Sequence, residues 1–133
     1  MIENILKELE LNKSPPAQDS ALTLAYLGDC VYEMYVRSYL IKDANHNVNT
    51  LHKQATRHVC CKAQAELFRK IEGQLTEEEM AVFKRGRNTK SHVPKNSDMN
   101  DYRVATGVEA LIGYLYLKGE KQRVCDLLKY IFI

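Results

Sequence analysis

Two acidic residues stand alone in otherwise apolar stretches of the 133-residue sequence. Glu109 is the only charged residue between Arg103 and Lys118, and Asp29 is the only one in the run 21–32. An ionised carboxylate is costly to bury unless a partner compensates its charge. Two such carboxylates on mostly apolar helices indicate a shared cation. The sequence therefore predicts a divalent metal site with Asp29 and Glu109 as its ligands.

Magnesium suits this pair of ligands. Hard cations bind carboxylate oxygens and keep several waters, so few protein ligands are needed and a substrate phosphate can complete the site. Simpler interpretations stay open. Asp29 is followed at four-residue spacing by Glu33 and Arg37, which fits a solvated helical stripe. Glu109 is alternatively explained by a partly exposed helix edge, or by pairing with an arginine such as Arg37 or Arg103.

A basic segment adds a third chemical element. Twelve residues without an acid hold five cations: Lys84, Arg85, Arg87, Lys90 and Lys95. Gly86 and Pro94 indicate a flexible loop, and cations on a loop suit contacts with phosphate, which dominate affinity for nucleic acid. A solvated surface loop is the other interpretation. Because the net charge of the chain is only +2, the local excess favours a polyanionic partner.

Composition excludes several classes of protein. The chain is 45% apolar and 27% charged, as in globular domains, and no apolar stretch reaches the roughly 20 residues of a membrane span. The acidic N-terminus is unlike a secretory signal. The four cysteines, at positions 30, 60, 61 and 125, lack C-x-x-C spacing. We expect reduced thiols in a cytoplasmic protein, with Cys30 and Cys125 as small core side chains.

Helical patterns run through nearly the whole chain and predict a single all-α domain over 1–133. The expected helices cover residues 2–11, 20–41, 50–71, 77–84, 98–117 and 120–131, with polar turns at 42–49 and 86–97. Asp19 or Ser20 is a plausible N-cap of the second helix. Thr76 and Glu79 form a capping box before the fourth helix, and Gly73 terminates the third.

Glycines predict how the two acids come together. The expected helix that carries Glu109 contains Gly107 and Gly113, and Gly28 directly precedes Asp29. Each glycine inside a helix costs about 1 kcal/mol relative to alanine. Such positions are best explained by the close approach of another backbone or a ligand. We therefore expect the two helices to cross closely, with both acids near the crossing.

The same motifs resemble those of a known family, ribonuclease III. The run A-Y-L-G-D-C-V-Y at 25–32 resembles its signature helix, F-L-G-D followed by a small and an apolar residue. The run T-G-V-E-A-L-I-G-Y-L-Y-L at 106–117 resembles its second motif. The segments K-R-G-R-N at 84–88 and V-P-K-N at 93–96 are similar to the central loop of the small bacterial branch, Mini-ribonuclease III.

The resemblance implies an all-α endonuclease domain that works as a homodimer and needs magnesium. It implies cleavage of double-stranded RNA to 5′-phosphate ends and, in the small branch, maturation of large-subunit (23S) ribosomal RNA precursors. Asp29 matches the catalytic aspartate and Glu109 the metal-binding glutamate. We expect the basic segment to hold the RNA without a separate double-stranded-RNA-binding domain. Tyr26 and Leu27 are expected near the centre of the dimer surface on the apolar 20–41 helix.

The chain departs from the family at two positions. Acids usually stand four residues before the aspartate and three before the glutamate, where this chain has Ala25 and Thr106. The number of metal ions therefore stays open, although Asp98 or Asp101 is available as a further ligand. Assistance by a ribosomal protein is also open. The alternative function is a catalytically silent RNA-binding or structural helical dimer module.

Overall fold

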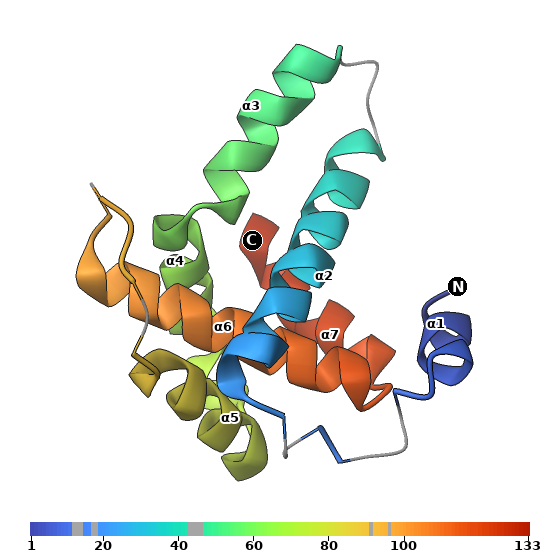
Figure 1. Ribbon diagram of the computed structural model, residues 1–133. Coiled ribbons are helices and arrows are strands. Elements are labelled where there is room, and N and C mark those ends of the chain that lie inside the picture. The colour runs from blue at the N-terminus through green and yellow to red at the C-terminus, as the bar shows by residue number, and fades with distance from the viewer. Residues whose placement is uncertain (12–14, 17–18, 43–46, 91, 96) are drawn as a thin grey trace.

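The computed structural model describes residues 1–11, 15–16, 19–42, 47–90, 92–95 and 97–133. Every regular element in this part of the chain is a helix, so the predicted all-α class is confirmed (Figure 1). The α-helices are α1 (Ile2–Glu8), α2 (Ala21–Ile41), α3 (Val48–Val59), α4 (Cys61–Ile71), α5 (Glu77–Asn88), α6 (Met99–Leu117) and α7 (Lys121–Leu128). Short 3-10 turns cover Glu72–Gln74 and Lys129–Phe132. None of the described helices has the length and hydropathy needed to cross a membrane.

Helix α6 forms the centre of the fold, with α2, α4 and α5 packed around it (Figure 1). From Ala105 to Leu117 every residue of α6 is buried except Glu109, which is half-buried. Fully buried side chains of the neighbouring helices complete the core: Leu24, Tyr32, Leu67, Ile71 and Phe83. A helix that is apolar around its circumference has to be enclosed in this way. Glu109 is therefore the single carboxylate within the enclosed stretch of α6.

Glycines set the distance between α2 and α6. A Cβ atom at Gly28 would overlap the carbonyl oxygen of Glu109, and one at Gly113 would overlap the carbonyl oxygen of Leu24. Each helix thus uses one glycine to admit the backbone of the other. The predicted close crossing is confirmed, and it places Asp29, the residue after Gly28, beside the segment that carries Glu109.

Helix α5 is longer than predicted. It begins at the predicted capping box but continues past Lys84, its predicted end, to Asn88, so two of the basic residues expected beyond the helix lie on its last turn: Arg85 and Arg87. The loop prediction is wrong for them because Gly86 is a packing residue. A Cβ atom there would lie 2.8 Å from the Cβ of Ala110 and 2.9 Å from the Cα of Gly107. The glycine therefore lets α5 rest closely on α6.

The predicted helix over 50–71 is broken into two. Helix α3 ends at Val59 and α4 begins at Cys61, because Cys60 adopts an extended conformation with φ −68° and ψ 161°. Neither glycine nor proline marks the break. As a result α3 forms an arm that extends from the body of the molecule together with the second half of α2, against which it packs (Figure 1).

Side chains from other helices cap the end of α3. The hydroxyl of Tyr32, on α2, donates to the carbonyl of His58 at 2.7 Å. The amide of Gln64, on α4, donates to the carbonyl of Val59 at 3.0 Å. Carbonyls at the end of a helix need partners from outside it, and these two buried side chains supply them at the break.

The remaining boundaries follow the predictions with small differences. Ser20 caps α2, accepting a hydrogen bond from the amide of Thr23, and Asp98 caps α6 in the same way. Helix α1 ends at Glu8, and the last helix gives way to a 3-10 turn after Leu128. In the predicted turn 42–49, residues 43–46 lie outside the described part of the chain.

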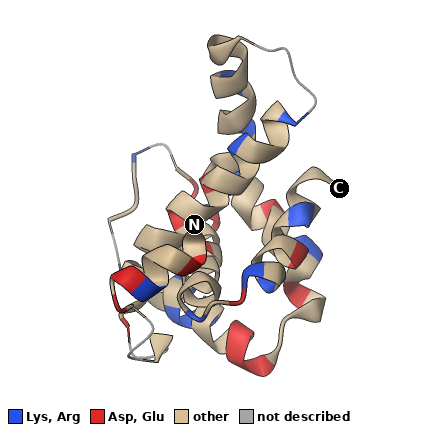
Figure 2. Cartoon of the chain, turned by 90° about the vertical axis from the view of Figure 1, so that its right-hand side faces the viewer, with Lys and Arg blue, Asp and Glu red and all other residues tan. Residues whose placement is uncertain are grey.

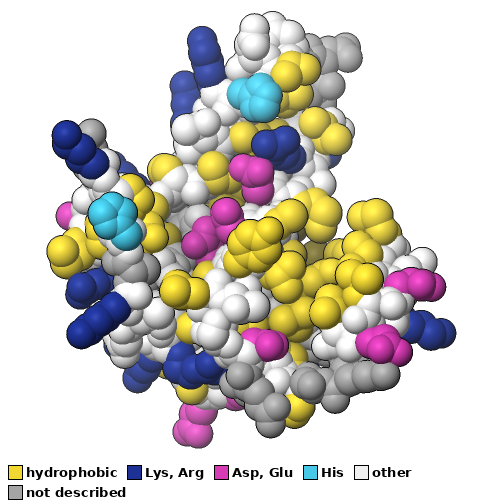
Figure 3. All heavy atoms as spheres, viewed as in Figure 1, with side chains coloured by type: hydrophobic (Ala, Val, Ile, Leu, Met, Phe, Trp, Pro, Cys, Tyr) yellow, Lys and Arg dark blue, Asp and Glu magenta, His cyan; other side chains and the backbone are white. Residues whose placement is uncertain are grey.

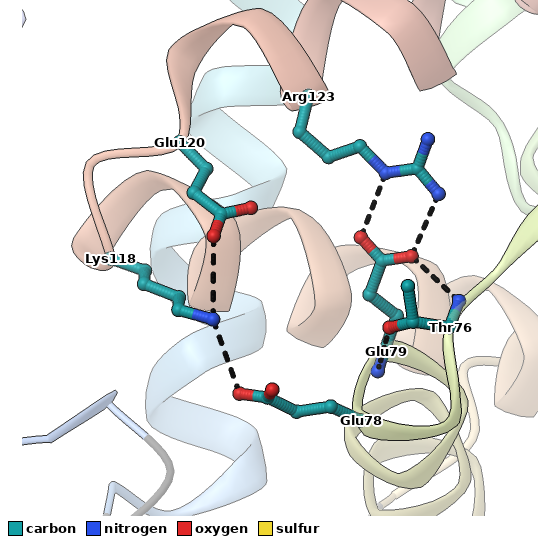
Figure 4. A network of polar contacts seen from close by, with 6 residues as sticks. All are labelled: Thr76, Glu78, Glu79, Lys118, Glu120 and Arg123. Carbon is teal, nitrogen blue, oxygen red and sulfur yellow. Dashed lines mark hydrogen bonds and ion pairs between the residues drawn. The ribbon is translucent and has the colours of Figure 1, made fainter.

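A partly buried ion pair joins α7 to the start of α5 (Figure 4). Arg123 donates from Nε and Nη2 to the two carboxylate oxygens of Glu79, at 2.8 Å each. Glu79 is only 5% exposed and also accepts from the amide of Thr76, completing the capping box. These hydrogen bonds, led by that from Arg123, hold the pKa of Glu79 below its usual value. A more exposed network around Lys118 lies beside this pair (Figure 4).

The cysteines correct one prediction. All four are unpaired, but Cys30 and Cys125, expected in the core, are exposed. Apolar sequence neighbours suggested burial, yet α2 keeps an apolar face toward solvent on which Tyr26 and Met34 are also exposed. An apolar neighbourhood in the sequence was therefore not evidence of burial for these thiols.

Candidate active site

The two acids singled out by the sequence meet where α2 crosses α6. Asp29 is exposed and Glu109 half-buried, and their side chains interact across the crossing. Burial raises the pKa of Glu109, and the adjacent Asp29 raises it further, to about 8. Two carboxyl groups this close cannot both ionise easily unless a cation lies with them. Such an arrangement can hold a cation, and perturbed carboxyl groups of this kind concentrate at functional sites.

Gln64 is a third polar side chain at this place, and sequence reasoning missed it. It lies on α4, is 2% exposed, and donates from Nε2 to the Oε2 atom of Glu109 at 3.3 Å. The only signal in the sequence was a glutamine between Ala63 and Ala65. That signal is weak, because glutamine is an ordinary residue on the exposed faces of helices.

The positions that depart from the ribonuclease III pattern are buried near the pair. Ala25 is 7% exposed and Thr106 is 6% exposed, and the hydroxyl of Thr106 donates to the carbonyl of Tyr102 in its own helix. Asp98 is used as the cap of α6. Among the described residues, no group of three or more His, Cys, Asp or Glu side chains is placed to hold a metal ion. In the part of the chain that the structure describes, the acidic side chains brought together at the crossing are this pair.

The simpler interpretations of the two acids have different outcomes. Asp29 is exposed on α2, as a solvated stripe predicts. Arg37 pairs with Glu33 at 3.2 Å on the surface of α2, as its spacing suggested. In the described part of the chain neither Arg37 nor Arg103 forms an ion pair with Glu109. A pair of carboxylates with no basic partner still fits a magnesium ion, which takes oxygen ligands and retains waters in its remaining positions.

The predicted RNA-binding residues differ in how they are held. Lys84, Lys90 and Lys95 are exposed. Arg85 donates to the carbonyl of Asp19 at 2.7 Å, which ties the end of α5 to the chain before α2. The guanidinium of Arg87 lies over the ring of Phe83, 5.8 Å from its centroid. The lysines are thus the members best placed for an external anion.

A second basic surface was missed by the sequence analysis. Helix α3 carries the exposed residues Lys53 and Arg57, and Figure 2 shows α3 at the top of the molecule with basic residues and no acid. The signal was present, because no acid occurs over residues 44–65. In Figure 3, acidic side chains in the middle of the face lie between basic ones on the loop before α6 and on α3.

The expected dimer residues also differ from one another. Tyr26 is 81% exposed on α2, whereas Leu27 is half-buried and packs against the core. Leu22 and Met34 are further exposed apolar residues of α2. Beyond Met34, a groove of apolar character runs between α2 and α7, lined in part by Val31 and Val124. This apolar face of α2 is next to the acidic pair in sequence and in space.

Comparison with known proteins agrees with this geometry. The ribonuclease III domain family matches residues 22–120, which include both acids and the crossing that joins them. The chain therefore belongs to the ribonuclease III family, whose members are metal-dependent endoribonucleases.

Individual relatives define the branch. The chain is 47% identical to the Mini-ribonuclease 3 of Clostridium tetani, over 92% of this chain and 82% of the relative. It is 48% identical to that of Enterococcus faecalis, over 85% and 88%. A crystal structure of a Fusobacterium nucleatum protein superposes with a TM-score of 0.82 at 32% identity, covering 90% of this chain and 97% of that one. The resemblance to Mini-ribonuclease III is confirmed.

Proposed function

We propose that this protein is a magnesium-dependent endoribonuclease that cleaves double-stranded RNA, with Asp29 and Glu109 as the groups that hold the metal. The observation that carries the proposal is the direct interaction of these two acids across the helix crossing, which adds to the effect of burial in raising the pKa of Glu109 to about 8. A bound cation removes the repulsion that this arrangement otherwise contains.

The chain's own contribution is to fix the two carboxylates. Gly28 and Gly113 let the backbones of α2 and α6 touch, so the distance between the acids is set by packed backbone and not by loops. When bound, the magnesium ion supplies Lewis acidity, which activates water and offsets the charge that develops on the phosphate. Preorganised groups of this kind act without reorganising during the reaction, which is why they strongly favour the transition state.

The RNA is proposed to lie across the acidic pair between two basic surfaces. One consists of the lysines at the end of α5 and in the loop before α6, and the other is α3. Contacts to phosphates fix the duplex without reading its sequence. Duplex RNA is recognised mainly by its shape, because its major groove is too deep and narrow for side chains. The cleavage products are proposed to carry 5′-phosphates.

The working form is proposed to be a homodimer joined through the apolar face of α2. Tyr26 is its most exposed large apolar residue at 81%, with Leu22 one turn before it. A second copy of the chain would cover this face and bring a second acidic pair to the duplex, one for each strand. Leu27 packs against the core beneath this face and is not expected to contact the second copy directly.

Within this function, we propose the precursor of large-subunit (23S) ribosomal RNA as the substrate, acted on in the cytoplasm. The support is the similarity to Mini-ribonuclease III in motifs and over most of the chain. Four unpaired cysteines suit a reducing compartment. A duplex formed by the ends of that precursor should be cut at defined positions and faster than an unrelated duplex. Adding large-subunit ribosomal proteins tests whether one of them assists.

Cleavage of a labelled RNA duplex tests the central claim. Asp29→Asn and Glu109→Gln should each lower the rate by at least about 100-fold, because each removes a charge that the site needs. The matched control is Glu33→Gln, a half-buried acid one turn along α2 that pairs with Arg37, which should cleave at close to the normal rate. If all forms, including the unmodified protein, bind the duplex without cutting it, the catalytically silent module is correct. Ala25 and Thr106 are the observations that keep that alternative worth testing.

A further inference from the structure

A buried glutamine connects the acidic pair to the break between α3 and α4. Gln64 is 2% exposed and lies on α4 against α6. Its Nε2 atom donates to the carbonyl of Val59 at 3.0 Å and to Oε2 of Glu109 at 3.3 Å. One amide nitrogen therefore joins the last residue of α3 to the deeper of the two acids.

The carbonyl of Val59 determines which way the amide points. A backbone carbonyl can only accept, so the amide nitrogen and not the amide oxygen must face it. The nitrogen's second N–H then faces Glu109, and this holds whatever the protonation state of that acid. Gln64 therefore donates a hydrogen bond to Glu109, and the carboxylate oxygen Oε2 accepts it.

The oxygen of the same amide is left without a partner. Oε1 of Gln64 is buried and, within the described part of the chain, is the one buried side-chain oxygen or nitrogen with no hydrogen bond. A buried polar atom without a partner is unfavourable, and in native proteins it calls for an explanation. Methionine or leucine would fill the same space without this cost. Packing alone therefore does not account for glutamine at position 64.

We propose that Gln64 is a positioning residue for Glu109. By holding Oε2 it fixes the rotamer of the carboxylate and leaves the second oxygen outside this hydrogen bond. It also couples the direction of α3, which Gln64 helps to cap, to the geometry of the acids. This inference rests on the proposed function, since the positioned group is one of the proposed metal ligands.

Tyr32 provides a matched control. It is fully buried, and its hydroxyl donates to the carbonyl of His58, the residue before Val59. Tyr32→Phe removes a hydrogen bond at the same break but none to Glu109. A purely structural effect of the break should appear in both variants, whereas a positioning effect should appear only when residue 64 is changed.

The test compares Gln64→Met, Gln64→Asn and Tyr32→Phe with the unmodified protein. The first readout is Mn²⁺ and Mg²⁺ binding to the RNA-free protein by calorimetry. Gln64→Met should weaken binding by roughly 10- to 100-fold, as is typical when a group that orients a metal ligand is lost. Gln64→Asn keeps the amide but is one methylene too short to reach both acceptors, so it should lie between. Tyr32→Phe should bind metal normally.

Steady-state cleavage provides the second readout. Gln64→Met should lower kcat and shift the magnesium dependence to higher concentration, with KM for duplex RNA unchanged. Normal metal binding by Gln64→Met would overturn the proposal, as would an equal loss in Tyr32→Phe. Failure of both position-64 variants to fold, judged by circular dichroism, would assign the residue to the fold and also overturn it. If the unmodified protein neither binds metal nor cleaves RNA, it is the proposed function that fails.

Discussion

The backbone of Gly28 rests on the carbonyl group of Glu109, with no room for a side chain between them. Replacing this glycine with alanine should push α2 away from α6 and separate the acids. We expect Gly28→Ala to destabilise the protein by on the order of 3 kcal/mol, because the obstructing atoms belong to backbone. Urea unfolding measures this. Gly73→Ala is the control, since a Cβ atom there meets nothing within 4 Å. Equal effects of the two would contradict the close crossing.

Removing the charge of Glu109 should stabilise the metal-free protein. Its pKa is raised from 4.5 to about 8, so between these values the folded state binds more protons than the unfolded chain. Stability therefore falls as the pH rises through this range. Glu109→Gln should melt roughly 2–5 °C higher than the unmodified protein at pH 8 in EDTA. The gain should shrink toward pH 5, and thermal scans at both values test it. A lower melting temperature at pH 8 would show that the acids do not strain the fold.

The Arg123–Glu79 pair should have the opposite dependence on pH. The pKa of Glu79 is lowered, so its stabilising contribution is complete above the carboxyl's ordinary value and is lost as the pH falls through the lowered one. Arg123→Met leaves a nearly buried carboxylate without its partner, which should cost on the order of 3 kcal/mol at pH 7. The cost should decrease at acid pH. Lys118→Met, in the exposed network beside it, should change stability little. Denaturant titrations at several pH values separate the two.

Loss of exposed lysines should weaken duplex binding in a salt-dependent way. For Lys90→Ala combined with Lys95→Ala, the slope of log affinity against log salt should fall by roughly one unit for each phosphate contact removed. The same change on α3, with Lys53 and Arg57 replaced, tests the second basic surface. Lys7→Ala on α1 serves as the control. Binding is measured with the cleavage-impaired Asp29→Asn form, and an unchanged slope would exclude that surface from the RNA contact.

Charge on the apolar face of α2 should separate the proposed dimer. Tyr26→Glu places a carboxylate where a second copy would pack, and its 81% exposure means that the monomer's own fold should be little affected. Sedimentation analysis should show half the mass of the unmodified protein. Met99→Glu, an exposed apolar residue on α6, should leave the mass unchanged. A substitution at Leu27 is less informative, since that side chain packs into the core.

The sequence predicted the features that depend on local chemistry. The caps at Ser20 and Thr76, and the close crossing signalled by Gly28 and Gly113, were all readable from residue type and spacing. Solitary charges in apolar runs identified Asp29 and Glu109, and the structure brings them together. Their catalytic roles remain proposals.

What the sequence did not reveal depends on distant partners. At the break at Cys60, Tyr32 donates to the carbonyl of His58, 26 residues away in the sequence. No glycine or proline near Cys60 indicates the break. Gly86 was interpreted as a loop residue because the sequence alone does not distinguish a glycine needed for close helix packing from a glycine in a turn. Gln64 was overlooked for the same reason, since its role is visible only once α6 lies beside it.

The bend at Cys60 has a consequence for how this enzyme family could diversify. The direction of the basic arm depends on residues of α2 and α4, because Tyr32 and Gln64 bind the carbonyls of His58 and Val59 at the end of α3. Because Gln64 contacts both the end of α3 and Glu109, substitutions near this bend should change the direction of the arm and the position of that carboxylate together. In the proposed function, the place of the cut along an RNA and the chemistry of the cut are therefore coupled.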